Sequence, residues 1–147
     1  MKYFIDFLEN PVVWTAVLGW VVAQALKIIF TWDKKFDFTR IVGSGGMPSS
    51  HASFVMSLTM AIGFELGFGS PEFALAGVMS FVVMYDATGV RRAAGQQAVI
   101  LNKLVDSIQR ADGAKTEKRL KELLGHTHLE VLAGAILGII IAIIRHV

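Results

Sequence analysis

The sequence has 147 residues, of which 54% are hydrophobic and 18% charged, and its formal net charge is +2. That hydrophobic fraction is high for a soluble globular protein, and so small a net charge argues against a nucleic-acid partner. Because the chain has no cysteine, disulfides and thiolate metal sites are excluded.

Four segments are long and apolar enough to cross a bilayer, which takes about 20 residues of helix. They are residues 12–32, 52–68, 72–90 and 129–144. The pattern predicts an all-α fold, namely a polytopic membrane bundle that forms a single domain over residues 1–147. Self-association into a homo-oligomer is left open.

Two further patterns refine this bundle. Apolar residues recur at helical spacing between the third and fourth spans, which predicts an amphipathic helix that lies on the membrane surface or caps the bundle; they are Ala98, Leu101, Val105 and Ile108. In the fourth span, Gly134 and Gly138 form a small-xxx-small pair, which permits close packing against another helix.

The basic residues predict the orientation of the bundle. Of the 14 Lys and Arg, three lie in residues 33–50 and eight in residues 91–128, two connections that four spans place on one side. By the positive-inside rule this side is cytoplasmic. The polar clusters at 43–51, 86–92 and 125–130 then share one membrane face, which favours a single active site there.

The first cluster ends in Pro48-Ser49-Ser50-His51, directly before the second span. Ser49 or Ser50 would cap the helix by accepting a hydrogen bond from a first-turn amide. The same helix start, with free amides and two hydroxyls, also suits an anion such as phosphate. His51 would stand beside that anion and exchange a proton near neutral pH.

The third cluster contains His126 and Glu130, which are four residues apart. On a helix the Glu130 carboxylate would hold one imidazole N–H and orient the other ring nitrogen. Such a pair makes imidazole a better nucleophile or base. The alternative is a polar helix start at the membrane interface.

Four charged residues near the same face are candidates for supporting roles. Asp86 lies inside an apolar segment, where an ionisable group usually faces the protein interior. Arg91 and Arg92 either anchor the span or bind phosphate oxygens through their planar guanidinium groups. Lys27 either extends to the membrane interface or contacts the phosphate.

Together these motifs resemble the divergent branch of the phosphatidic acid phosphatase type 2 superfamily, which also contains bacterial acid phosphatases and vanadium haloperoxidases. The superfamily signature is Lys-x6-Arg-Pro, then Pro-Ser-Gly-His, then Ser-Arg-x5-His-x3-Asp. Pro48-Ser49-Ser50-His51 is similar to the second part, and His126-x3-Glu130 followed by Val-Leu-Ala-Gly134 is similar to the third. The third part's usual arginine is replaced by Leu120, and Arg91 and Arg92 are the candidates to take its place.

The resemblance implies hydrolysis of a lipid phosphomonoester or diphosphate through a phosphohistidine, with no obligatory metal or other cofactor. It gives His126 as nucleophile, Glu130 as its orienting carboxylate and His51 as the acid for the leaving group. The phosphate would be bound by Ser49, Ser50, Arg91, Arg92 and Lys27.

We expect an integral protein of a bacterial plasma membrane whose partners are the membrane and the lipid substrate. Phosphatidylglycerophosphate and phosphatidate are favoured as substrates, and undecaprenyl diphosphate is the alternative. Two other classes stay open: a metal-binding transporter or metalloenzyme using His51, His126, His128, Asp86 and Glu130, and a non-catalytic binder of lipid phosphates.

Overall fold

The computed structural model describes residues 1–30, 46–112, 120 and 125–147, and the described residues contain helices but no strand. The all-helical prediction is therefore confirmed. The helices are α1 (Lys2–Leu8), α2 (Pro11–Phe30), α4 (Ser50–Leu66), α5 (Pro71–Thr88), α6 (Val90–Asp112) and α7 (His128–His146).

Three of the described helical segments are long and apolar enough to cross a membrane, so the predicted count of four is approximate. They are Pro11–Ile29, Pro71–Ile108 and His128–His146. The remaining predicted span, 52–68, corresponds to α4, which has only 17 residues. This helix is short because Ser49 caps its start and Gly67, at φ +93°, ends it.

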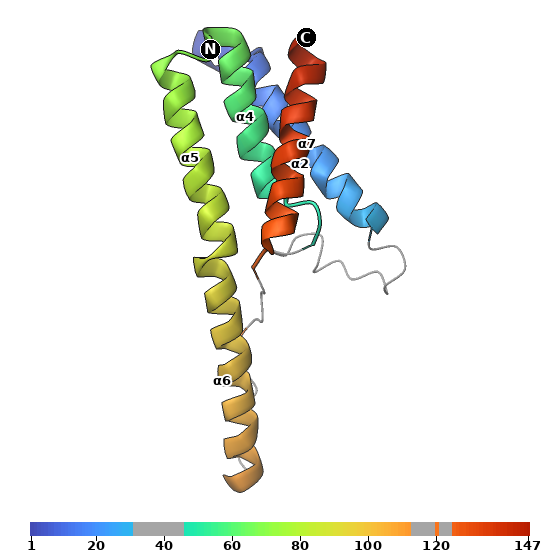
Figure 1. The fold of residues 1–147 in the computed structure, drawn as a ribbon, viewed down its shortest axis with the longest axis vertical. Coiled ribbons are helices and arrows are strands. Elements are labelled where there is room, and N and C mark those ends of the chain that lie inside the picture. Colours follow the sequence, from blue (N-terminus) through green and yellow to red (C-terminus); the bar gives the residue numbers. More distant parts are fainter. Residues whose placement is uncertain (31–45, 113–119, 121–124) are drawn as a thin grey trace.

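The predicted amphipathic helix is present as α6, but its placement differs from the prediction. It continues from α5 and projects beyond the end of the bundle (Figure 1). Helical hydrogen bonds pass through Gly89, whose amide donates to the Tyr85 carbonyl at 2.9 Å and whose carbonyl accepts from Ala93 at 2.9 Å. Helix α5 itself ends at Thr88, and α6 follows it directly from Val90.

Helix α4 is the centre of the bundle and packs against α2, α5 and α7. Its buried face is made of small and hydroxylated residues, and their side chains bond to neighbouring helices. Ser53 Oγ donates to the Gly19 carbonyl at 2.8 Å, and Ser57 Oγ donates to the Gly138 carbonyl at 3.2 Å. Such bonds are worth about 0.6–2 kcal/mol each in a membrane, where van der Waals packing supplies the rest.

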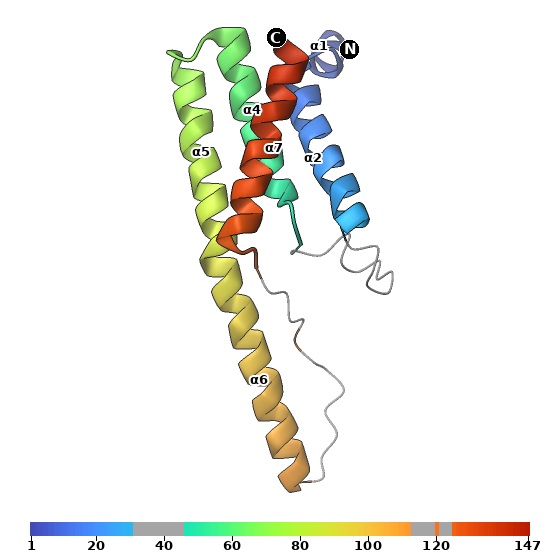
Figure 2. The ribbon, with the colours of Figure 1, turned by 45° about the vertical axis from the view of Figure 1, so that its right-hand side comes forward.

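Both chain termini lie at one end of the bundle (Figure 2). The opposite end gathers the C-terminal end of α2, the N-terminal end of α4, the α5–α6 junction and the start of α7. Three polar motifs predicted to share one face lie on these segments.

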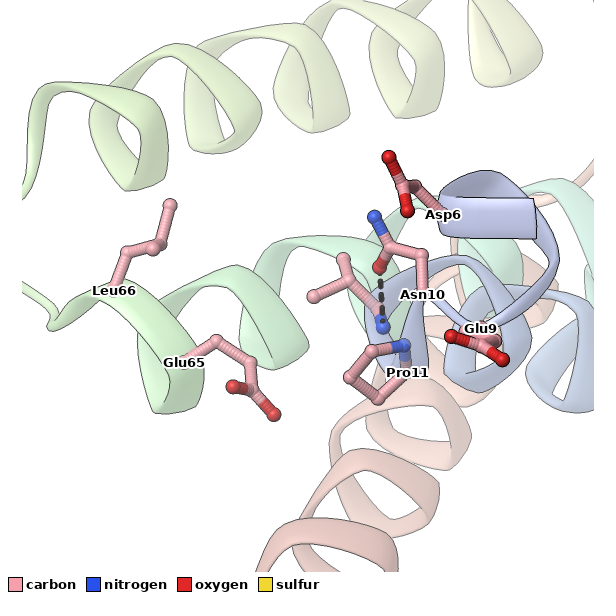
Figure 3. A pocket seen from close by; sticks show the side chains of 7 residues that line it. Asp6, Glu9, Asn10, Pro11, Glu65 and Leu66 are labelled. Carbon is pink, nitrogen blue, oxygen red and sulfur yellow. Dashed lines mark hydrogen bonds between the residues drawn. The ribbon is translucent and has the colours of Figure 1, made fainter. Parts of the chain in front are cut away.

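A further polar cluster, which the sequence analysis does not anticipate, lies at the end that carries the termini. His146 contacts Glu65 Oε1 through Nδ1 at 3.3 Å and Thr15 Oγ1 through Nε2 at 2.9 Å, and it stacks on Phe64. An open pocket of about 480 Å³ adjoins Glu65 (Figure 3); it is lined by Asp6, Glu9, Asn10, Pro11, Val12, Glu65 and Leu66. Because His146 and Glu65 are far apart in the sequence, only the fold pairs them.

Candidate functional site

The Pro48–His51 motif forms the start of α4. Ser49 is the N-cap: its Oγ accepts from the Ala52 amide at 3.3 Å, which confirms the predicted cap. Ser49 is fully buried and Ser50 is 3% exposed. His51, the next residue, is exposed. The helix start therefore directs its serines into the bundle and its histidine outward.

The His126–Glu130 motif forms the start of α7. The Glu130 Oε2 atom lies 3.2 Å from His126 Nδ1, as the spacing predicts. The same atom accepts from the Thr127 amide at 2.9 Å, while Thr127 Oγ1 accepts from the Glu130 amide at 3.3 Å. Thr127 and Glu130 thus make a capping box. A carboxylate fixed by its own helix start holds the imidazole in one orientation.

Backbone contacts join the two motifs directly. The Ser49 amide donates to the Glu130 carbonyl at 2.9 Å, and the His126 amide donates to the Ala87 carbonyl at 3.2 Å. These contacts bring the two histidine rings together: the ring centroids of His51 and His126 are 6.1 Å apart, and the rings meet edge to face. His126 is 2% exposed, whereas His51 is exposed, so the pair joins the interior of the bundle to its surface.

Lys27 comes from the last turn of α2 and completes this cluster. Its ammonium Nζ donates to Ser50 Oγ at 3.1 Å, and the residue is only 5% exposed. The side chain therefore points into the protein, and the alternative in which it extends to the membrane interface is wrong. Glu130 is close enough to stabilise its charge. A Cβ added at Gly46, whose φ is +87°, would lie 4.0 Å from Lys27 Cδ, so this glycine is near the Lys27 stem.

The other predicted residues lie around the α5–α6 junction. Asp86 is half-buried, one residue before the Ala87 carbonyl that holds the His126 amide. Arg92 is exposed in the first turn of α6, and no described contact joins it to either histidine. The side chain of Arg91 lies outside the described part of the structure.

The residues of the metal-binding alternative do not gather as ligands. Within the described ranges, no three His, Asp or Glu side chains are arranged to hold a metal ion. His128, the first residue of α7, is exposed, while His126 is buried. The histidines of this end are therefore divided between the interior and the surface.

Thr127 is a positioning residue that the sequence analysis missed, although Thr127-x-x-Glu130 has the capping-box spacing. Thr127→Ala is expected to weaken the helix start by about 1 kcal/mol and to loosen the Glu130 contact with His126. Thr127→Ser keeps the hydroxyl and is the matched control. Nitrogen-15 NMR of labelled histidine should show altered His126 resonances only in Thr127→Ala; unchanged His126 resonances in both variants would contradict this role.

Comparisons with known proteins give the family of this chain. The model of the divergent PAP2 family matches residues 8–141. A protein of Bacillus subtilis (strain 168), described as the uncharacterized membrane protein YuiD, is 36% identical over an alignment that covers 95% of this chain and 96% of the relative. No solved structure matches the chain significantly. With its apolar helices and its paired histidine motifs, this integral membrane protein belongs to the divergent PAP2 family.

Proposed function

We propose that this protein is a lipid-phosphate phosphatase that hydrolyses its substrate through a phosphohistidine. The observation that carries the proposal is the pairing of His126 with Glu130, with its ring centroid 6.1 Å from that of His51. Ser50, the first residue of α4, accepts a hydrogen bond from the Lys27 ammonium at 3.1 Å. A nucleophile, an orienting carboxylate, a second imidazole and a cation are groups suited to phosphoryl transfer.

In the first step, Nε2 of His126 attacks phosphorus while Nδ1–H donates to Glu130, and the bond from phosphorus to the ester oxygen breaks. The leaving oxygen takes a proton from His51. In the second step, water attacks the phosphohistidine with His51 accepting its proton, and inorganic phosphate and free His126 are released. His51 thus ends each cycle protonated, ready to act again as an acid.

The phosphate oxygens are assigned to Lys27, the Ser50 hydroxyl, the first-turn amides of α4 and the two arginines, Arg91 and Arg92. The positive end of a helix dipole and an ammonium both favour an anion at this point. Ser49 was also a candidate, but its hydroxyl is fully buried and engaged as the cap. We therefore assign Ser49 to the geometry of the helix start.

We assign a lipid substrate because the site lies at one end of helices that are apolar enough to cross a membrane. Phosphatidylglycerophosphate and phosphatidate are the favoured lipids.

The positive-inside rule predicts that this end of the bundle is cytoplasmic. Because the chain has no cysteine, a single cysteine can replace either Arg92 or Glu72, which lies in the first turn of α5 at the other end of the bundle. Labelling of these cysteines in intact cells reports the orientation of the protein in the membrane. Labelling of the Arg92 position by an impermeant reagent would reverse the assignment.

The test of activity is phosphate release by the purified protein in detergent, measured on phosphatidate, phosphatidylglycerophosphate and undecaprenyl diphosphate. We expect turnover of at least one of the first two. Binding without release from any lipid would replace the proposal with the non-catalytic binder. Activity that follows stoichiometric zinc and is lost with EDTA would replace it with a metalloenzyme.

A further inference from the structure

Asn102 is a buried polar residue of α6, the helix that projects beyond the bundle. It is 6% exposed, while its two neighbours in the chain, Leu101 and Lys103, are exposed. Apart from its junction with α5, α6 makes no extensive contact with another described helix. Because a buried side-chain amide needs hydrogen-bond partners, the partners of Asn102 indicate what this part of α6 holds.

Both polar groups of the Asn102 side chain bind the backbone of one residue. Its Nδ2 donates to the Leu120 carbonyl at 2.9 Å, and its Oδ1 accepts from the Leu120 amide at 3.0 Å. Two paired residues of an antiparallel sheet exchange the same two bonds. Asn and Gln are the side chains that carry an amide donor and a carbonyl acceptor on one planar group. Asn102 therefore fixes both the position of Leu120 and the direction of the chain there.

Leu120 precedes His126 by six residues, and the α5–α6 helix holds both of them. Asn102 in α6 binds Leu120, while the Ala87 carbonyl in α5 accepts from the His126 amide at 3.2 Å. From residue 87 to residue 102 a helix rises about 22 Å, at 1.5 Å per residue. A chain of six residues spans at most about 22 Å. The bond at Leu120 therefore limits where His126 can lie.

We propose that Asn102 is a positioning residue for His126. By holding Leu120, it restricts the chain that enters α7 and keeps the His126 ring at Glu130 and beside His51. The inference rests on the proposed function for the part that His126 plays in catalysis, whereas the effect of Asn102 on His126 is independent of turnover. It also gives α6 a role, because the helix extends far enough beyond the bundle to anchor the chain before α7.

The test compares the removal of two side-chain amides from α6 in the purified full-length protein. Asn102→Leu keeps a branched side chain of similar shape and removes both bonds to Leu120. Gln97→Leu, at an exposed position of the same helix, is the matched control. Hydrogen–deuterium exchange followed by mass spectrometry should show faster exchange of the Leu120 amide in Asn102→Leu only.

Nitrogen-15 NMR of labelled histidine then reports on the site. We expect Asn102→Leu to shift the His126 resonances and to leave those of His146, at the other end of the bundle, unchanged. Unchanged His146 resonances show that the bundle is folded. If Asn102→Leu does not fold, Asn102→Asp is the second variant; its carboxylate keeps the acceptor but has no donor, so it should shift the His126 resonances less.

In the phosphate-release assay, Asn102→Leu should lower kcat by up to about a hundredfold, the cost of misplacing a reacting group by about 1 Å. KM should change little, since Lys27 and Ser50, which are assigned to the phosphate, lie on other helices. Faster exchange at Leu120 with wild-type His126 resonances would overturn the proposal. Because exchange and NMR need no turnover, displaced His126 resonances in a protein that releases no phosphate would uphold the anchor and reject the phosphatase.

Discussion

Replacing His126 with alanine is expected to abolish formation of the phosphoenzyme and to lower kcat by about a thousandfold or more, the scale seen when a covalent nucleophile is removed. The backbone bond from the His126 amide to the Ala87 carbonyl does not depend on the side chain and should persist in the variant. The measurement is rapid-quench trapping of radioactive phosphate from a labelled lipid phosphate, under alkaline conditions that preserve phosphohistidine.

His128→Ala is the matched control, since His128 is exposed and only two residues away. It should retain both trapping and turnover. His51→Ala is expected to slow phosphoenzyme formation by about 10²–10⁴-fold with poor leaving groups, and much less with a good leaving group such as p-nitrophenolate. Full trapping in His126→Ala would show that another residue is the nucleophile.

Replacing Gly134 with alanine is expected to have the largest effect on stability. A Cβ at this position would lie 2.2 Å from the Ser49 carbonyl oxygen and 3.1 Å from the Ala52 Cβ. Since the first contact is with backbone, α7 would have to move away from α4. Overpacking of this kind costs about 1–3 kcal/mol and sometimes more, and here it would also break the bond between Ser49 and Glu130.

Gly77→Ala is the control for Gly134→Ala, because a Cβ at Gly77 in α5 meets nothing within 4 Å. It should raise the unfolding midpoint slightly, since alanine favours a helix over glycine by about 1 kcal/mol. Thermal unfolding in detergent, followed by circular dichroism, compares the two variants. Equal midpoints for Gly134→Ala and wild type would show that α4 and α7 do not pack as closely as described.

The contact between α4 and α7 also explains why the histidine motifs meet. Gly134 and Gly138 were predictable from the sequence as a close-packing pair, but their partner was not. In the structure they face the carbonyls of Ser49 and Ser53. The close contact at these two glycines therefore helps to fix where α7 lies along α4, and this in turn helps to place His126 beside His51.

Local patterns in the sequence determined the helical character of this protein, its membrane location and the pairing of His126 with Glu130. These features depend on runs of apolar residues and on pairs of residues spaced three or four apart. Within one helix such pairs lie on the same face and contact each other, whatever the rest of the chain does. The capping box at Thr127 was equally local and could have been predicted.

Tertiary structure alone decided that Lys27 turns inward to Ser50, that α6 continues α5 beyond the bundle, and that the rings of His51 and His126 lie close together. Each of these depends on which helices are neighbours, and that is settled by close packing of small residues over long sequence distances. The motif at the start of α4 thus becomes a site only when α2 and α7 close around it.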